Sequence, residues 1–380
     1  MIDELKEVVK LATSLTALTS EILKLKPNNK NAKDNEIVIA NKKIYAQIGS
    51  SGDSAQIGSS GDSAQIGSSG DSAKIGSSGD YAQIGSSGDY AQIGSSGDSA
   101  QIGSSGDSAQ IGSSGDYAQI GSSGDSAQIG SSGDSAQIGS SGDSAQIGSS
   151  GDYAQIGSSG DSAKIGSSGD SAKIGSSGDY AKIDVTGNDT VACGIGINTI
   201  IKGKLGTWIT LAEYDKDNKP ICVKSAQIDN KILKEDFYYI LLNGKFTECV
   251  KIDGIISIVI NKHKNVYKVQ NLGSSKESYI VKDGDIYSHG DTIKEAKDGL
   301  LYKISNRDTS KYKDFTKDTE VTLKEAIEMY RAITGAYEGG TRYFIENVLT
   351  DKKEKYTVQE VINLTRGQYN HEKLVEFFKA

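Results

Sequence analysis

The hydrophobic positions of the chain repeat every nine residues through much of its first half. From Gly49 to Ile183 the sequence is Gly-Ser-Ser-Gly-Asp-(Ser/Tyr)-Ala-(Gln/Lys)-Ile, repeated fifteen times without an insertion. In each unit only Ala and Ile are apolar, and one polar residue separates them, so both side chains lie on one face of a short strand. The Gly-Ser-Ser-Gly-Asp stretch has the composition of a turn. The pattern therefore predicts one strand and one turn for every nine residues.

Repeated units of this kind predict a β-solenoid, because a strand this short buries nothing alone, whereas stacked units build a continuous core of Ile and Ala. A flexible Gly/Ser linker is the alternative, but a linker has no reason to keep Ile at a fixed period. Tyr45, Tyr81, Tyr117 and Tyr153 recur every 36 residues, a multiple of 18 but not of 27. We therefore predict a mainly β fold, with a solenoid of 18-residue coils over residues 36–183.

The N-terminal segment predicts a helix. Over residues 1–27, apolar positions alternate at spacings of three and four, which is typical of an amphipathic helix. These positions are Val8, Leu11, Leu15, Leu18, Ile22 and Leu25. The helix, expected over residues 2–26, either pairs with a copy of itself, giving a homo-oligomer, or folds onto the first coil; the sequence leaves both open.

The region after Ile183 predicts a cap that protects the last coil, because an open sheet edge promotes aggregation. A degenerate repeat with one residue extra is expected first, and Trp208–Ala212 has the pattern of a strand. We predict a β cap over residues 184–260, a β-rich tail over 261–320 and a small helical module over 321–380.

Turn and helix-start signals support this division. Asn243-Gly244, Asp253-Gly254 and Asp283-Gly284 each lie between apolar runs, as in β-hairpins. Thr322 with Glu325, and Thr357 with Glu360, have the spacing of capping boxes at helix starts.

Composition excludes several classes of protein. The chain has 380 residues and three cysteines, too few for a disulfide framework and without the spacing of metal ligands. No apolar run is long enough to span a membrane. The three histidines, His263, His289 and His371, are isolated, and no catalytic motif is present. We therefore expect a cytoplasmic protein that is not an enzyme, has no cofactor and does not associate with membranes.

Charge is distributed unevenly. The formal net charge is −8, but the fifteen repeats contain fifteen Asp and only four Lys, so they carry 4 − 15 = −11, and the remainder of the chain carries +3. An 18-residue coil places these Asp residues in two rows. They are Asp53, Asp62, Asp71, Asp80, Asp89, Asp98, Asp107, Asp116, Asp125, Asp134, Asp143, Asp152, Asp161, Asp170 and Asp179.

Three interpretations of the Asp rows are open. Each Asp caps its own turn by accepting backbone N–H groups. Alternatively, the rows bind Ca²⁺, since the repeat resembles the calcium-binding nonapeptide, although its Asp is displaced by one residue and Ser replaces a Gly. In the third interpretation, the carboxylates imitate nucleic-acid phosphates and occupy a basic cleft of another protein.

Other segments of the chain resemble phage and prophage proteins in which a cap module follows an array of short repeats. The similarity is carried by Gly206–Tyr214 (Gly-Thr-Trp-Ile-Thr-Leu-Ala-Glu-Tyr), Val223–Asp229, Asn243–Phe246, Tyr330–Gly335, Glu338–Arg342 and Leu364–Tyr369. It covers about residues 45–248 and extends to parts of 321–380. The resemblance implies a β-solenoid with a cap, encoded by a mobile genetic element, and implies no catalytic activity. The N-terminal helix departs from it, because family members often begin with a globular module.

These observations lead to two candidate functions. The first is a phage-encoded binding protein, acting in the host cytoplasm, whose acidic solenoid blocks a host defence enzyme that handles nucleic acid, as anti-CRISPR and anti-restriction proteins do. Its partner has a basic cleft, and the chain itself is not expected to bind nucleic acid. The second is a structural or adhesive virion component, with Tyr45, Tyr81, Tyr117 and Tyr153 as an alternative binding strip.

Overall fold

The computed structural model describes residues 38–41, 45–252, 255–284, 286–304, 309–336, 341, 344–345, 349 and 353–379. The predicted helix over residues 2–26 and the predicted turn at Asp253-Gly254 lie outside the described residues. The chain divides into two compact units, 1–248 and 249–380.

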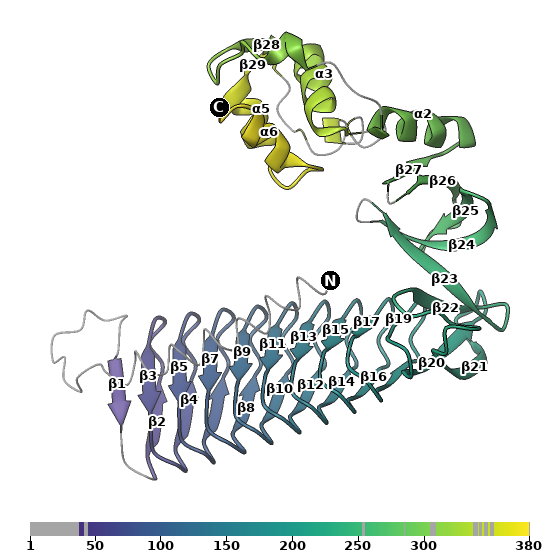
Figure 1. Ribbon diagram of the computed structural model, residues 1–380. Helices are drawn as coiled ribbons and strands as arrows, with labels where there is room; N and C mark the ends of the chain where they lie inside the picture. Colours follow the sequence, from purple (N-terminus) through teal and green to yellow (C-terminus); the bar gives the residue numbers. More distant parts are fainter. Residues whose placement is uncertain are drawn as a thin grey trace. The chain divides into compact units, whose positions relative to one another are not determined.

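The first unit contains a β-solenoid in which successive strands alternate between two parallel sheets (Figure 1). Sheet A contains β1 (Val38–Asn41), β3 (Gln56–Ser59), β5 (Lys74–Ser77), β7 (Gln92–Ser95), β9 (Gln110–Ser113), β11 (Gln128–Ser131), β13 (Gln146–Ser149), β15 (Lys164–Ser167), β17 (Lys182–Val185) and β19 (Ile200–Lys202). Sheet B contains β2 (Gln47–Ser50), β4 (Gln65–Ser68), β6 (Gln83–Ser86), β8 (Gln101–Ser104), β10 (Gln119–Ser122), β12 (Gln137–Ser140), β14 (Gln155–Ser158), β16 (Lys173–Ser176), β18 (Val191–Gly194) and β20 (Trp208–Tyr214).

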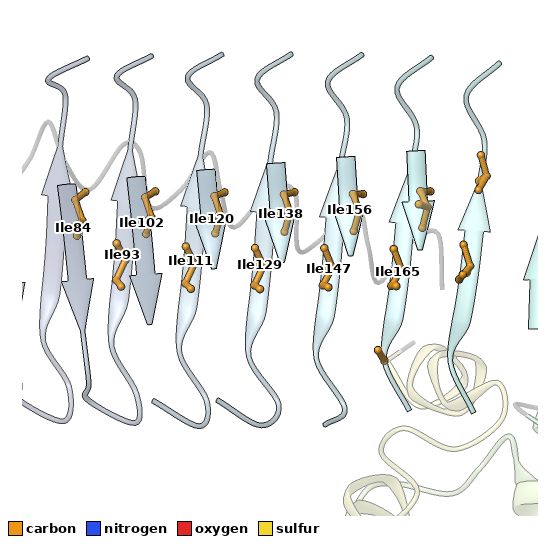
Figure 2. Close-up of a cluster of buried hydrophobic side chains, with 14 of the residues drawn as sticks. Ile84, Ile93, Ile102, Ile111, Ile120, Ile129, Ile138, Ile147, Ile156 and Ile165 are labelled. Atoms are coloured by element: carbon orange, nitrogen blue, oxygen red, sulfur yellow. The ribbon is translucent and has the colours of Figure 1, made fainter. Parts of the chain in front are cut away.

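The strand register confirms the predicted coil, in which two repeats make one full circuit. Ile48 pairs with Ile66, and Ile66 with Ile84, in sheet B, while Ile57 pairs with Ile75 in sheet A. Figure 2 shows the two resulting columns of isoleucine side chains, one from each sheet. The isoleucines of sheet A are fully buried from Ile57 to Ile183, and those of sheet B nearly so. The two columns form the core between the sheets.

Each strand from β2 to β16 has the sequence Gln/Lys-Ile-Gly-Ser, so it includes two residues that the sequence pattern assigns to the turn. Ile and Ser point into the core, and Gln and Gly point outward, because neighbouring residues of a strand face opposite sides. The buried Ala directly before each strand fills the core beside the turn. The inward Ser is replaced by the buried Val185 in β17.

Contact between successive turns explains the second glycine of the repeat. A Cβ atom at Gly106 would overlap the backbone carbonyl of Gly88 in the coil before, and the same holds for the equivalent glycines from Gly70 to Gly187. The first glycine of the repeat is different in sheet B, where a Cβ atom at Gly103 meets no atom within 4 Å. Only the second glycine is therefore required for stacking.

The parallel ladder continues past the last exact repeat. Ala192 pairs with Ile174, its equivalent in the coil before, so the predicted extra residue after Ile183 is wrong. The turn formed by Asp184–Asp189 has the normal length, although its sequence is degenerate. Trp208–Ala212 does form a strand, as predicted, within β20.

Antiparallel strands cover the final strand of each sheet. In sheet B, β21 (Pro220–Gln227) pairs with β20, and in sheet A, β22 (Tyr238–Leu242) pairs with β19. Asn243 and Gly244 both have positive φ and connect β22 to β23 (Lys245–Ile252), which confirms the predicted hairpin turn. The carboxylate of Glu213 accepts the N–H groups of both turn residues, at 2.6 and 2.7 Å.

A buried ion pair reinforces the cap. Asp184 stands where the repeat has an outward glycine, and its carboxylate lies 3.1 Å from the ammonium group of Lys202 in the next coil. The Tyr238 hydroxyl donates to the same carboxylate at 2.9 Å. The side chains of Lys182 and Lys202 contact the ring of Tyr238. Strand β22 thus supplies a hydrogen bond to one carboxylate oxygen, Oδ2 of Asp184, while Oδ1 is buried without a hydrogen bond to a described residue.

The second unit combines an antiparallel meander with helices. The meander contains the end of β23, β24 (Ile255–His263), β25 (Val266–Asn271), β26 (Glu277–Asp283) and β27 (Ile286–Gly290). Gly284 has positive φ between β26 and β27, as the predicted hairpin requires. Helix α2 (Ile293–Ile304) packs on β26 and β27 and was not predicted; its region was expected to be β-rich.

A separate core holds the C-terminal part of this unit. It contains the 3₁₀ helix η1 (Ser310–Tyr312), the pair β28 (Glu320–Thr322) and β29 (Lys355–Thr357), and helices α3 (Leu323–Thr334), α5 (Val358–Leu364) and α6 (His371–Phe377). Both predicted capping boxes are present at the starts of α3 and α5. Hydrogen bonds from Thr322 lower the pKa of Glu325, and hydrogen bonds from Lys353 and then from Thr357 lower the pKa of Glu360.

The stacking requirement gives a test with a matched control. We expect Gly106→Ala to destabilise the solenoid by about 1–3 kcal/mol, because the added methyl group forces the two turns apart. Gly103→Ala, in the same coil, should leave stability unchanged or slightly raised, since its methyl group enters open space. Urea unfolding followed by circular dichroism measures both. Equal effects of the two substitutions would contradict the stacking described here.

Candidate functional site

The turns place the fifteen repeat Asp residues along the two edges of the solenoid. Turns leading into sheet A carry acidic edge 1, which consists of Asp53, Asp71, Asp89, Asp107, Asp125, Asp143, Asp161 and Asp179. Turns leading into sheet B carry acidic edge 2, which consists of Asp62, Asp80, Asp98, Asp116, Asp134, Asp152 and Asp170. All are exposed except the half-buried Asp179. Successive carboxylates on an edge belong to adjacent coils, about 4.8 Å apart.

From Asp98 onward, most of these carboxylates accept a hydrogen bond from a backbone N–H group of the next coil. The Oδ1 atom of Asp116 accepts the backbone N–H of Asp134 at 2.7 Å, and Asp134 does the same for Asp152 at 2.8 Å. The acceptors are Asp98, Asp116, Asp125, Asp134, Asp143, Asp152, Asp161, Asp170 and Asp179. Each of these nine carboxylates therefore caps the turn of the following coil rather than its own turn, which corrects the first interpretation at these positions.

Identical repeats adopt two kinds of turn. In the first kind, the N–H after the Asp donates to the preceding coil, as from Tyr81 to the carbonyl of Asp62. In the second kind, it donates to the following coil, as from Ser99 to the carbonyl of Asp116, and the donor residue is left-handed. On acidic edge 1, the turns are of the first kind up to Ser108 and of the second kind from Ser126 onward. On acidic edge 2, they are of the first kind up to Tyr81 and of the second kind from Ser99 onward.

The two turns exchange one hydrogen-bond acceptor for another. In turns of the first kind, a glycine N–H donates to the Oγ of the inward serine, as from Gly88 to Ser86 at 3.3 Å. In turns of the second kind, the N–H of the Asp, not of the glycine, donates to the carboxylate of the Asp in the preceding coil, as from Asp152 to Asp134. The Oγ of a serine such as Ser140 is then buried without a hydrogen-bond partner among the described residues. A left-handed Ser or Tyr costs about 1–3 kcal/mol, and the charge-assisted bond to the carboxylate offsets this cost.

The second oxygen of the carboxylate stays available on both edges. Of the fifteen repeat Asp residues, only Asp170 uses Oδ2 in a hydrogen bond to a described residue, the amide of Asn188 at 3.3 Å. Hydrogen bonds from the backbone N–H and from the side-chain amide of Asn188 lower the pKa of Asp170. Its contribution to stability is therefore complete above the ordinary Asp pKa and is lost as the pH falls through the lower value of the folded state.

Basic side chains of the repeats lie away from the edges. Lys74, Lys164 and Lys182 are outward residues of sheet A, and Lys173 is an outward residue of sheet B. Within the described part of the chain, Lys74, Lys164 and Lys173 form no salt bridge to a repeat Asp, and Lys182 lies over the ring of Tyr238. The repeats themselves therefore place no positive charge between the carboxylates of the two edges.

The exposed tyrosines occupy the predicted positions. Tyr45, Tyr81, Tyr117 and Tyr153 each lie two residues before a strand of sheet B, at every second coil, with exposed fractions of 62–82%. Tyr90 and Tyr180 precede strands of sheet A. The tyrosines thus form a strip along the sheet B side of acidic edge 2, as the 36-residue spacing predicts.

The histidines and cysteines are the next candidate site residues in the part of the chain that the structure describes. Groups of three or more His, Cys, Asp or Glu side chains suited to a metal ion are absent from it. His289 is buried in β27, while His263 and His371 lie in other elements. The cysteines Cys193, Cys222 and Cys249 are free, and burial raises the pKa of Cys193. Among these residues, no helix is long and apolar enough to cross a membrane.

The acidic edges and the solenoid thus define a repeat protein with a charged, periodic surface. Comparisons with protein-family models, curated proteins and solved structures gave no match. The chemistry of the site therefore has to be argued from its own geometry.

Replacements at one Asp separate the hydrogen bond from the charge. Asp134→Asn keeps an oxygen that accepts the N–H of Asp152, whereas Asp134→Ala removes it. We expect Asp134→Ala to destabilise by about 0.5–1.5 kcal/mol and Asp134→Asn to be neutral or mildly stabilising, since it also relieves repulsion between neighbouring carboxylates. Thermal unfolding at low and high salt measures both. If the two variants unfold alike, the Asp ladder does not stabilise the stack.

Proposed function

We propose that the chain is a non-enzymatic binding protein whose acidic edges imitate the phosphates of a nucleic acid. The target is an enzyme with a basic nucleic-acid-binding cleft, and the resemblance to phage and prophage proteins favours a host defence enzyme of the CRISPR or restriction type. One observation carries the proposal: fifteen carboxylates stand in two uninterrupted rows on a regular scaffold.

Charge density supports this role. With one carboxylate per coil on each edge, the solenoid presents about one negative charge per 2.4 Å of its axis. Duplex DNA presents one per about 1.7 Å, counting both strands. The two linear densities are similar, so a cleft that holds DNA through Lys and Arg side chains meets a comparable field along the solenoid.

Rigidity supports it as well. Backbone bonds and the carboxylate ladder fix the rows before binding, as between Asp116 and Asp134. A preorganised surface loses little conformational entropy on association, and affinity benefits accordingly. Because one carboxylate oxygen remains free, holding the next coil and contacting a partner are compatible.

A second candidate function is a structural or adhesive virion component. The observation that favours it is the strip of exposed tyrosines, Tyr45, Tyr81, Tyr117 and Tyr153, beside the outward glutamines of sheet B. Loss of binding to a cell surface or virion on replacement of these tyrosines, with the Asp rows intact, would favour this function over the first.

The proposed function is tested by neutralising three neighbours of acidic edge 2. The triple variant Asp116→Asn, Asp134→Asn, Asp152→Asn keeps the hydrogen-bond acceptors and removes three charges. We expect the parent protein to inhibit DNA cleavage by at least one enzyme in a panel of CRISPR and restriction nucleases, in competition with DNA. Inhibition should weaken steeply between low and physiological salt, and the variant should inhibit at least about tenfold less well.

A second triple variant is the matched control. Asp298→Asn, Asp314→Asn, Asp318→Asn removes three exposed charges from the other unit and should leave inhibition unchanged. Equal inhibition by the two triple variants, or no inhibition of any nuclease by the parent, would overturn the proposal.

A further inference from the structure

A long groove runs along the outer face of sheet B. It has a volume of about 1740 Å³ and is lined in coil after coil by the same three residues, a Gln or Lys, an Ile and a Gly, from Gln47 to Gly175, and at its end by Val191. The floor over the glycines is open and shallow, since a Cβ atom at Gly85, Gly103 or Gly121 would meet nothing within 4 Å. Small-molecule sites measure about 300–1,000 Å³, so the length and volume of this groove suit an extended polymer.

One wall of the groove is a ladder of side-chain amides. At the first two coils, Gln47 donates to Gln65 at 3.2 Å. The exposed amides that follow, at Gln83, Gln101, Gln119, Gln137 and Gln155, form no hydrogen bond to the described residues. Each offers two donor hydrogens and an acceptor oxygen, repeated about every 4.8 Å. Such a ladder matches a ligand that carries both hydroxyl donors and hydroxyl acceptors at regular intervals.

Aromatic rings accompany this ladder at twice its period. Tyr81, Tyr117 and Tyr153 each precede a groove glutamine of the same coil by two residues, and all three rings are more than 60% exposed. Their spacing of two coils is about 9.6 Å. In an extended β-1,4-linked glycan every second sugar presents the same face, and the apolar face of a sugar stacks on aromatic rings.

The charges in and around the groove indicate that its ligand is uncharged. The described lining of the groove contains no carboxylate and a single lysine, Lys173, while both flanking edges are acidic. A polyanion is repelled by these edges. A second copy of the chain seated face to face would bring four acidic edges together, at the roughly 10 Å spacing of packed sheets. An uncharged polymer avoids both penalties.

We propose that the sheet B groove binds an extended, uncharged β-linked polysaccharide, with the glutamine amides bonded to sugar hydroxyls and the tyrosines stacked on alternate sugars. This activity is independent of the phosphate-mimic function, because it uses the outer face of sheet B rather than the carboxylates.

The test uses native gels containing hydroxyethyl cellulose and calorimetry with cellohexaose and chitohexaose. The parent protein should be retarded in the gel and should bind at least one of these β-linked sugars, but neither maltohexaose nor heparin. The variant Tyr81→Ala, Tyr117→Ala, Tyr153→Ala should bind at least about tenfold more weakly. Gly85→Val, Gly103→Val, Gly121→Val fills the groove and should also abolish binding, with circular dichroism unchanged.

Two controls distinguish sugar binding in the groove from binding elsewhere on the chain. The variant Tyr90→Ala, Tyr180→Ala removes tyrosines that precede strands of sheet A and should bind the sugars like the parent. Neutralising Asp116, Asp134 and Asp152 should weaken nuclease inhibition but not sugar binding, so the two proposals fail separately. The proposal is overturned if no β-linked sugar binds, if the Tyr90/Tyr180 variant loses binding equally, or if sedimentation shows a dimer that the glycine variant dissociates.

Discussion

Contact between turns of successive coils determines most of what this solenoid can do. The backbone of Gly106 lies so close to the carbonyl of Gly88 that no side chain fits between them. This approach allows the parallel ladder to continue in register, with Gln119 paired to Gln137 and each neighbouring position of the strand paired to its equivalent in the next coil. In-register stacking then places each side chain of one coil directly beside its equivalent in the next. Each position of the repeat therefore forms a continuous row of like side chains along the solenoid.

The rows of Asp side chains destabilise the solenoid through repulsion between neighbouring carboxylates. Unit charges about 4.8 Å apart repel, and the repulsion is about 1 kcal/mol per pair in bulk water. Salt with a Debye length of about 8 Å screens neighbouring carboxylates only partly. In the coils after Asp98, a hydrogen bond from the backbone N–H of the next Asp to the carboxylate offsets part of this repulsion, as between Asp161 and Asp143. The same Asp side chain therefore both holds the next coil and supplies the negative surface charge. This hydrogen bond is what makes an unbroken row of acidic residues compatible with a stable fold.

Much of the solenoid could be predicted from sequence, because a strict repeat leaves few alternatives. The period of Ile gives the unit, the period of Tyr gives the coil, and both follow from positions alone. The cap was also predictable, since Trp208–Ala212 alternates and Asn243-Gly244 demands positive φ. Helix α2 was not predicted, although Ile293, Ala296 and Leu300 have the three- and four-residue spacing of a helical face. The single repeat sequence could not reveal two kinds of turn, since Ser99 and Tyr81 follow the same Gly-Asp pair. They nevertheless differ in backbone conformation and in the neighbouring coil to which the N–H donates. The sheet B groove was likewise hidden, because it arises only when glycines from many coils align.

The coil of two repeats is the claim on which the acidic edges, the tyrosine strip and the groove all depend. Disulfide formation between engineered cysteines tests it directly, after the native Cys193, Cys222 and Cys249 are replaced by alanine. Gln119 and Gln137 are paired on neighbouring strands, a separation that a disulfide spans. Gln119 and Gln146 would be neighbours in a coil of three repeats, but here they belong to different sheets. Under mild oxidation, the Gln119→Cys, Gln137→Cys protein should cross-link quantitatively and the Gln119→Cys, Gln146→Cys protein should stay reduced, as seen on non-reducing gels. Preferential cross-linking of the second pair would contradict the fold and every function derived from it.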